Sequence, residues 1–311
     1  MKHVFILNPA AGKGKAETHY LPLIHAAAKE LEIDYEIHRT INIGDGEGFT
    51  KRRCESREKE TEVLRFYACG GDGTLSEVVN GAFGHKNVEV GFIPAGTGND
   101  FARSFDHEKD FIQLKNQILG TGKIIDLLRY TIDGGPERYC VNMFNIGFDC
   151  DVVVKMDELR RFSFLAGSSA YGAGVGLVLI KKDTLALTIV VDDGTEKKGK
   201  ILMMAVGNGK YCGGGFKGLP DASVTDGLMD VSIIQNIKRR QFVSLIGDYR
   251  KGTHLNTKLG KKIVHYEQCK GITIKDENPF GICIDGEVEQ GRVLRVDLVP
   301  KAILFSVPRH S

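Results

Sequence analysis

The 311-residue sequence has almost no net charge, because 42 lysines and arginines are balanced by 40 aspartates and glutamates to leave a formal charge of +2. A nucleic-acid-binding domain is normally strongly basic, so we expect no nucleic-acid partner. The basic residues that do cluster belong either to solvated faces or to a surface that meets anions. These clusters are Lys51-Arg52-Arg53, Arg160-Arg161, Lys181-Lys182, Lys238-Arg239-Arg240 and Lys261-Lys262.

The sequence has no pair of cysteines in CxxC spacing, and its seven cysteines are odd in number. A disulfide framework is built from paired cysteines, and many structural zinc sites use the CxxC spacing. We therefore expect neither a disulfide framework nor a zinc site. This cysteine usage suits a reducing cytosol, so we expect a cytoplasmic protein.

Long apolar runs are also missing. Residues 4–7 are too few for a signal peptide, and Asn8-Pro9 ends their run. Residues 162–180 carry no charge, but they include four glycines and three serines. That composition is too weakly apolar for a membrane-spanning helix, and we expect a buried or interfacial segment there.

Glycine is abundant, at 38 residues or about 12% of the chain, against a usual level of roughly 7%. Up to about residue 125, short apolar runs alternate with amphipathic stretches, which predicts a parallel sheet covered by helices. Strands are expected at 4–7, 35–39, 66–69 and 88–93, and helices at 16–31, weakly within 46–60, and from the Gly70 turn to 83.

After that point the pattern changes to short β-prone runs separated by turn signals, which predicts a mainly antiparallel β domain. We place the domains at 1–128 and 129–311. The last strand can belong to the first domain in this arrangement. The expected strands are 127–132, 139–146, 185–191, 201–206, 229–234, 271–274, 281–284 and 294–299, with helices at 152–161 and 240–251.

Three polar, glycine-containing segments follow strands of the first domain, at the sheet edge where such folds bind ligands. In the first, residues 8–15 (NPAAGKGK), small residues leave backbone N–H groups accessible and Lys13 and Lys15 can neutralise phosphate. The segment has neither the GxxxxGK[ST] nor the GxGxxG spacing. A tight structural turn is therefore an equally good interpretation of this segment alone.

The second segment is Gly70-Gly71-Asp72-Gly73-Thr74, between an expected strand and helix. Its glycines let a nucleotide lie against the main chain, and Asp72 can organise a cation or a lysine. The third segment spans residues 94–103, where Arg103 either pairs with Asp100 or approaches a phosphate. Two such loops on adjacent strand ends predict a nucleotide site.

Taken together, these segments resemble the catalytic domain of the diacylglycerol kinase/sphingosine kinase superfamily, specifically the soluble bacterial lipid kinases of the diacylglycerol kinase type. The resemblance covers nearly the whole chain and implies an α/β nucleotide-binding domain followed by a β-sandwich domain. The segments that carry it are NPAAGKGKA (8–16), GGDGTLSEVVNG (70–81), GFIPAGTGNDFARS (91–104), NIGFDCDVV (145–153), GNGKYCGGG (207–215), PDASVTDGLMDV (220–231) and IDGE (284–287).

The resemblance also implies ATP as a cofactor. Ser76 stands where the family usually has asparagine, and this difference removes one amide from the site. Thr40 is counted among the implied ATP-binding residues only because it follows the second strand. The implied ATP-binding residues are Asn8, Pro9, Ala10, Ala11, Gly12, Lys13, Thr40, Gly70, Gly71, Asp72, Gly73, Thr74, Leu75, Ser76, Gly96, Thr97, Asn99 and Asp100.

A magnesium loop and a general base are implied in the same way. Ser223, Asp226 and Leu228 match the family's structural Mg²⁺ loop, although an Asp-Gly β-turn explains the same residues. Glu287 matches the proton acceptor, with Asp285 as its partner and Asp72 as a further catalytic carboxylate. Without the resemblance, Asp285-Gly286 predicts a simple hairpin turn.

These features predict an ATP- and Mg²⁺-dependent lipid kinase that converts diacylglycerol to phosphatidate and serves phospholipid biosynthesis. With no spanning segment, the enzyme would reach its lipid by transient peripheral association with the membrane, and the resemblance is compatible with a homodimer. Two alternatives stay open. One is a kinase of the same superfamily with another acceptor, such as a sphingoid base, phosphatidylglycerol or NAD; the other is a non-catalytic nucleotide-binding regulator.

Overall fold

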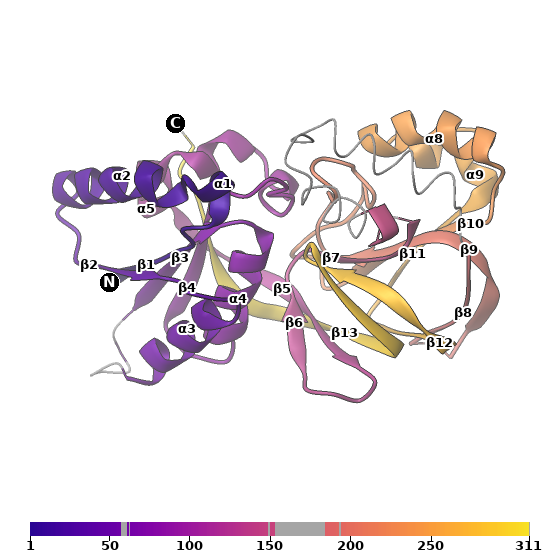
Figure 1. The fold of residues 1–311 in the computed structure, drawn as a ribbon, viewed down its shortest axis with the longest axis horizontal. Helices are drawn as coiled ribbons and strands as arrows, with labels where there is room; N and C mark the ends of the chain where they lie inside the picture. The colour runs from indigo at the N-terminus through magenta and orange to yellow at the C-terminus, as the bar shows by residue number, and fades with distance from the viewer. Residues whose placement is uncertain (57–60, 62, 149, 153–183, 193, 311) are drawn as a thin grey trace. The chain divides into compact units, whose positions relative to one another are not determined.

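The computed structural model describes residues 1–56, 61, 63–148, 150–152, 184–192 and 194–310 (Figure 1). The chain forms two compact units. The first comprises Met1–Leu127, Val224–Asp226 and Val299–Ser311, and the second comprises Leu128–Ser223 and Gly227–Leu298. The segment 162–180 and nearly all of the expected helix 152–161 lie outside the described residues.

The first unit is built on a parallel sheet with the strand order β2-β1-β3-β4-β13. Its apolar runs are buried throughout, as expected for parallel strands covered on both faces. The strands are β1 (Lys2–Leu7), β2 (Tyr35–Arg39), β3 (Leu64–Gly70), β4 (Val88–Pro94) and the end of β13 (Glu287–Val307).

Helices cover this sheet on both faces (Figure 1). One face packs against α2 (Ala16–Glu30) and α5 (Leu114–Ile118), with Phe5, Tyr67 and Ile93 in the shared core. The other face packs against α4 (Asp72–Ala82), which in turn contacts α3 (Asp45–Glu55). The predicted helix-covered parallel sheet is therefore confirmed.

The second unit is an antiparallel β structure with the order β11-β10-β9-β7-β12-β13, in which β8 pairs with both β9 and β12 and β5 pairs with β6. Inward-facing side chains such as Phe144, Ile189 and Met204 form its main core, which confirms the β-sandwich prediction. The elements are β5 (Thr121–Ile132), β6 (Arg138–Cys140), β7 (Met143–Gly147), β8 (Leu185–Val191), β9 (Glu196–Gly207), β10 (Met229–Gln235), α8 (Arg239–Lys251), α9 (Gly260–Ile263), β11 (Val264–Cys269) and β12 (Gly271–Ile284).

Several strand limits differ from prediction. The strands β5, β9 and β13 extend beyond the expected 127–132, 201–206 and 294–299, and three further differences follow. The expected strand 139–146 is divided into β6 and β7, because the N–H groups of Val141 and Asn142 donate to the Asp285 side chain. The expected strands 271–274 and 281–284 are one strand, β12, whose register shifts between Lys275 and Phe280. The polar strand β11 was not predicted.

Candidate active site

The first two polar loops are joined by hydrogen bonds at the carboxyl end of the parallel sheet. The Asn8 backbone N–H donates to the Cys69 carbonyl over 3.0 Å. The Asn8 side-chain amide donates to Thr74 Oγ1 over 3.1 Å. The Thr40 N–H donates to the Leu7 carbonyl over 3.0 Å, which places Thr40 directly beside the first loop. The predicted residues of these loops therefore lie together.

The first loop has an unusual backbone. Gly12 and Lys13 both adopt left-handed conformations, with φ of 61° and 59°, inside the short turn α1 (Ala11–Gly14). Few lysines adopt this conformation, and such strained residues cluster at functional sites. A Cβ added to Gly12 would lie 3.5 Å from the Ala95 carbonyl oxygen, so this loop also approaches the third loop.

The second and third loops meet backbone to backbone. A Cβ on Gly96 would lie 2.5 Å from the Cα of Gly71, and a Cβ on Gly71 would lie 3.4 Å from the Cα of Gly96. The Ala95 N–H donates to the Gly70 carbonyl over 2.7 Å. The Phe101 N–H points to Asp72 Oδ1 over 3.4 Å. The close approach itself thus requires glycine at position 96, whereas a Cβ at position 71 would make a tight but nearly ordinary contact.

The remaining predicted residues of this edge have distinct environments. Asn99, at φ 54°, exchanges two hydrogen bonds with Gly96, so its amide holds the third loop in shape. Leu75 is buried in the sheet core, which leaves only its backbone for a ligand, whereas Thr97 is exposed. Gly73 and Ser76 are half-buried at the start of α4.

Arg103 forms ion pairs within its own segment. Its Nε lies 3.7 Å from Asp100 Oδ1, and its Nη1 lies 3.4 Å from Glu108 Oε2. Asp100 is buried, so its pairing with Arg103 is a structural contact. Of the two alternatives for Arg103, the geometry favours the pairing with Asp100.

An open cavity of about 520 Å³ adjoins the first and third loops. Of the predicted ATP-binding residues only Gly12 lines it, so the cavity overlaps the predicted site at its edge. Lys15 and His19 give the wall basic groups, and the Tyr20 hydroxyl donates to the Pro94 carbonyl over 3.1 Å. The lining residues are Gly12, Lys15, Ala16, Thr18, His19, Tyr20 and Ala95.

Of the predicted catalytic carboxylates of the second unit, Asp285 lies in a two-residue hairpin turn and Glu287 follows it. Ile284 pairs with Glu287 across β12 and β13, and Asp285 and Gly286 between them have φ of 48° and 94°. Two positive φ values are characteristic of the type I′ turn expected for an Asp-Gly hairpin. Glu287 is exposed on this turn, and Asp285 is buried.

Asp285 is held by four donors. Its Oδ2 accepts from the Val141 N–H over 2.8 Å, and its Oδ1 accepts from the N–H groups of Asn142 and Met143 over 2.9 and 3.2 Å and from the Cys140 thiol over 3.1 Å. Burial raises the pKa of Asp285, and these hydrogen bonds act in the opposite direction. The arrangement favours an anchoring function for Asp285, which orients the turn that presents Glu287.

The predicted magnesium loop contains a sharp turn. Gly227 has φ of 76°, and the preceding Asp226 is exposed. The Val224 carbonyl accepts a hydrogen bond from the Asp126 N–H over 2.8 Å, which fixes one end of the loop. Ser223 and Leu228 are half-buried. The turn satisfies the simpler Asp-Gly interpretation, and an exposed carboxylate on it is accessible to a cation.

Sequence reasoning assigned no function to a polar row on one face of the second unit's sheet. Ser232, Ala205, Asn145 and Cys283 stand opposite one another on β10, β9, β7 and β12, so their side chains share a face. Among the described residues, Ser232 Oγ and Asn145 Oδ1 are buried and have no hydrogen-bond partner. Buried polar atoms of this kind call for an explanation.

Asn208 is a second unpartnered group in the same unit. It is fully buried, its backbone N–H donates to the Asn142 carbonyl over 2.9 Å, and both of its side-chain amide atoms lack a partner in the described part of the chain. The only sequence signal was that Asn145 and Asn208 belong to the segments 145–153 and 207–215 that carry the family resemblance.

The fold and the joined glycine loops define a nucleotide-dependent phosphotransferase. Residues 2–130 match the family described as "Diacylglycerol kinase catalytic domain", and residues 142–306 match "YegS C-terminal NAD kinase beta sandwich-like domain". The chain belongs to this family of lipid kinases. As a kinase of this family it uses ATP.

Alignments with other lipid kinases cover most of the chain. It is 27% identical to a diacylglycerol kinase of Mycobacterium tuberculosis, in an alignment 317 positions long that covers 98% of this chain and 95% of the relative. It is also 27% identical to a YegS-like lipid kinase of Stenotrophomonas maltophilia, with 89% and 87% covered. A diacylglycerol kinase structure from Bacillus anthracis, at 21% identity and a TM-score of 0.67, shares the fold over 98% of this chain and 96% of that one.

Proposed function

We propose that this lipid kinase transfers the γ-phosphoryl group of ATP, with Mg²⁺, to the hydroxyl of diacylglycerol and produces phosphatidate for phospholipid synthesis. The observation that carries the proposal is the backbone contact between Gly71 and Gly96. Without side chains at these two positions a triphosphate can approach the main chain, and the exposed Lys13 of the first loop can neutralise its charge. The name of the Mycobacterium tuberculosis relative supports diacylglycerol as the acceptor.

Three carboxylates are assigned separate functions in the phosphoryl transfer. Phosphoryl transfer relies mainly on positioning and on charge stabilisation, and the acceptor hydroxyl must lose its proton. Glu287, exposed on its turn, takes that proton, and Asp285 holds the turn in place. Asp72, at the start of α4, would help to hold Mg²⁺. Once bound, the ion would supply charge neutralisation for the triphosphate.

A structural Mg²⁺ on the loop Ser223–Leu228 gives a direct stability prediction. Metal that binds only the folded state stabilises it by mass action. We expect millimolar Mg²⁺ to raise the melting temperature of the wild type and to leave that of Asp226→Ala unchanged. The control is Asp276→Ala, in the irregular part of β12, which should keep the Mg²⁺ response. An equal response in Asp226→Ala and wild type means that the loop is a turn and holds no metal.

We further propose that Asn145 and Ser232, which stand on either side of Ala205 on one face of the sheet, receive the polar part of the acceptor lipid. An unpartnered buried amide costs about 1–3 kcal/mol, and function is a common reason for such a cost to persist. We expect Asn145→Leu to unfold at the same or a higher temperature than wild type, while the KM for lipid rises at least about tenfold and the KM for ATP stays unchanged.

The matched control for this variant is Asn278→Leu, an exposed position of β12 that should change neither KM. If Asn145→Leu melts well below the wild type and its KM for lipid is unaltered, Asn145 is a structural residue and the acceptor assignment is wrong.

Attachment to the membrane surface is proposed for α8 and α9. Val243 is 57% exposed on α8, and Arg240, Lys251, Lys261 and Lys262 are exposed on the same two helices. An apolar side chain among basic residues suits the surface of an anionic bilayer. No helix among the described residues is long and apolar enough to span a membrane.

The test of the proposed function is ATP consumption by the purified protein against a panel of acceptors in mixed micelles. Diacylglycerol should give the highest kcat/KM and labelled phosphatidate as product. Turnover of a sphingoid base, phosphatidylglycerol or NAD in its place would keep the kinase and change the acceptor. ATP binding without turnover of any acceptor would identify a nucleotide-binding regulator.

A further inference from the structure

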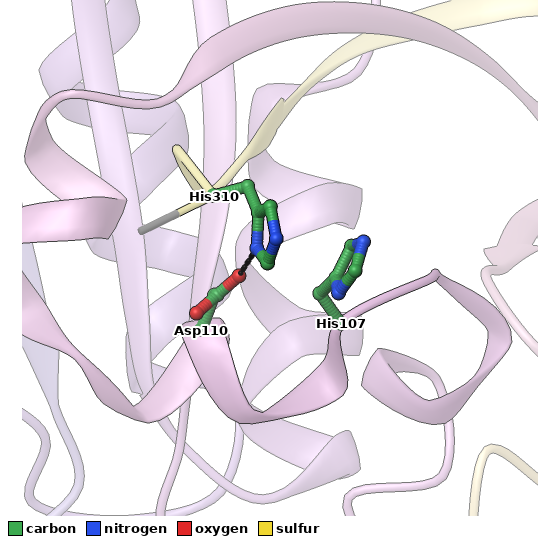
Figure 2. A group of neighbouring side chains, drawn as sticks. All are labelled: His107, Asp110 and His310. Atoms are coloured by element: carbon green, nitrogen blue, oxygen red, sulfur yellow. Dashed lines mark hydrogen bonds and ion pairs between the residues drawn. The ribbon is translucent and has the colours of Figure 1, made fainter.

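The first unit brings together two histidines and an aspartate that no part of the kinase chemistry uses. His107 precedes the short helix η2 (Glu108–Ile112), Asp110 lies within it, and His310 follows the end of β13. One ligand atom from each residue lies within 4.8 Å of the others. Figure 2 shows the His310 ring between the Asp110 carboxylate and the His107 ring.

The three side chains are arranged around His310. Its Nδ1 lies 2.9 Å from Asp110 Oδ2, and its ring stacks on that of His107 with centroids 3.7 Å apart and planes 24° apart. Asp110 is buried, whereas the His310 side chain is 63% exposed and His107 is also exposed. The carboxylate is thus fixed in the interior, and the two imidazoles lie at the surface.

The backbone beneath the three residues is well anchored. Phe111, next to Asp110, and Phe105 both pack on Phe305 of β13, with ring centroids 6.3 and 5.3 Å apart. The Arg309 N–H donates to the Asn116 carbonyl over 2.9 Å, which holds the segment that carries His310. His107 has a left-handed backbone, with φ of 62°, and its carbonyl accepts from the Asp110 N–H over 2.9 Å.

We propose that His107, Asp110 and His310 form a binding site for a late transition-metal ion, with Zn²⁺ as the most suitable. Two imidazole nitrogens and one carboxylate oxygen match zinc, whereas Mg²⁺ prefers an all-oxygen set. Ligand atoms of tetrahedral zinc are roughly 3.3 Å apart, so the two exposed rings must turn out of their stack for a nitrogen of each to point at the ion. The fourth position is left for water or another ligand.

This site is independent of the kinase centre and of its Mg²⁺. It joins η2 to the segment after β13, so bound metal would hold the end of that segment, itself part of the first unit, against η2. The expectation of no zinc site rested on cysteine spacing alone. All seven cysteines are buried, and the two histidines, 203 positions apart in sequence, gave no spacing signal.

The test is a zinc titration of the full chain, stripped of metal, in competition with a chromophoric chelator. Wild type should bind one Zn²⁺ per chain, and millimolar Mg²⁺ should not displace it. His107→Ala and His310→Ala should each weaken binding at least about tenfold, and the double variant should lose it. His25→Ala, an exposed histidine of α2, is the matched control and should bind as wild type does.

Two further measurements keep the outcome unambiguous. Co²⁺ in the same site should absorb as a nitrogen- and oxygen-ligated ion without a thiolate band, which excludes the cysteines. Hydrogen exchange of the Arg309 amide should slow with Zn²⁺ in wild type and not in His310→Ala, whose melting temperature without metal should equal that of wild type. Zinc bound equally by the double variant, or no zinc bound by wild type, overturns the proposal.

Discussion

Glu287→Gln is expected to reduce kcat at least about a hundredfold while the affinity for ATP changes less than about threefold. Glutamine keeps the shape of glutamate but cannot take a proton at neutral pH. A general base typically contributes about 10²–10⁴-fold and needs no contact with adenine or ribose. Steady-state kinetics with lipid, together with calorimetric ATP binding, measure the two quantities separately.

Asp285→Asn should give a different result, because Asp285 accepts hydrogen bonds from Val141, Asn142 and Met143. The asparagine NH₂ group cannot accept them, so a loss of about 1–3 kcal/mol in the free energy of unfolding is expected. Glu289→Gln, an exposed neighbour on β13, is the control for both variants. If wild type binds ATP and turns over no lipid, and Glu287→Gln does not differ from it, the catalytic assignment is wrong.

Gly71→Val is expected to weaken ATP binding at least about a hundredfold, or about 2.7 kcal/mol, with the fold preserved. The Cβ at this position faces the Cα of Gly96 at 3.4 Å, so a methyl group is nearly accommodated there. The two γ-methyl groups of valine instead occupy the space in which a phosphate approaches the main chain. Calorimetric titration with ATP and a thermal melt measure the two effects.

The control for this variant is Gly199→Val, at an exposed position where an added Cβ meets no atom within 4 Å. The geometry also ranks two equal changes. Gly96→Ala should damage ATP binding more than Gly71→Ala, because its Cβ would lie 2.5 Å from the Cα of Gly71. Wild-type ATP affinity in Gly71→Val would remove this turn from the site.

The first unit could be predicted well because its signals are local. Apolar runs bounded by Asn8-Pro9 and by Gly70-Gly71 give each strand a clear end, and β2 was predicted with its observed limits, Tyr35–Arg39. Carboxyl ends of parallel strands meet at one sheet edge, so loops that are far apart in sequence had to converge there. Asn8 and Thr74 are indeed hydrogen-bonded across that edge.

The features of the site that could not be predicted from the sequence depend on long-range contacts or on backbone conformation. The left-handed Lys13 has no signature in residue type. The anchoring of Asp285 requires knowledge that the backbone near residue 141 reaches the turn. That Asn145 Oδ1 has no hydrogen-bond partner among the described residues can be known only from its surroundings, and the pairing of His310 with Asp110 spans 200 positions.

Because β13 lies near the C-terminal end of the sequence, the first unit can complete its sheet only late in translation. Its sheet is completed by residues from Val299 onward, where Leu304 and Phe305 pair with β4 beside the strands of the N-terminal region. During translation β4 therefore stays an unpaired edge strand until all of the second unit has been synthesised, and such edges promote aggregation. A fragment ending near Leu127 would carry the glycine loops and still be a poor nucleotide-binding module.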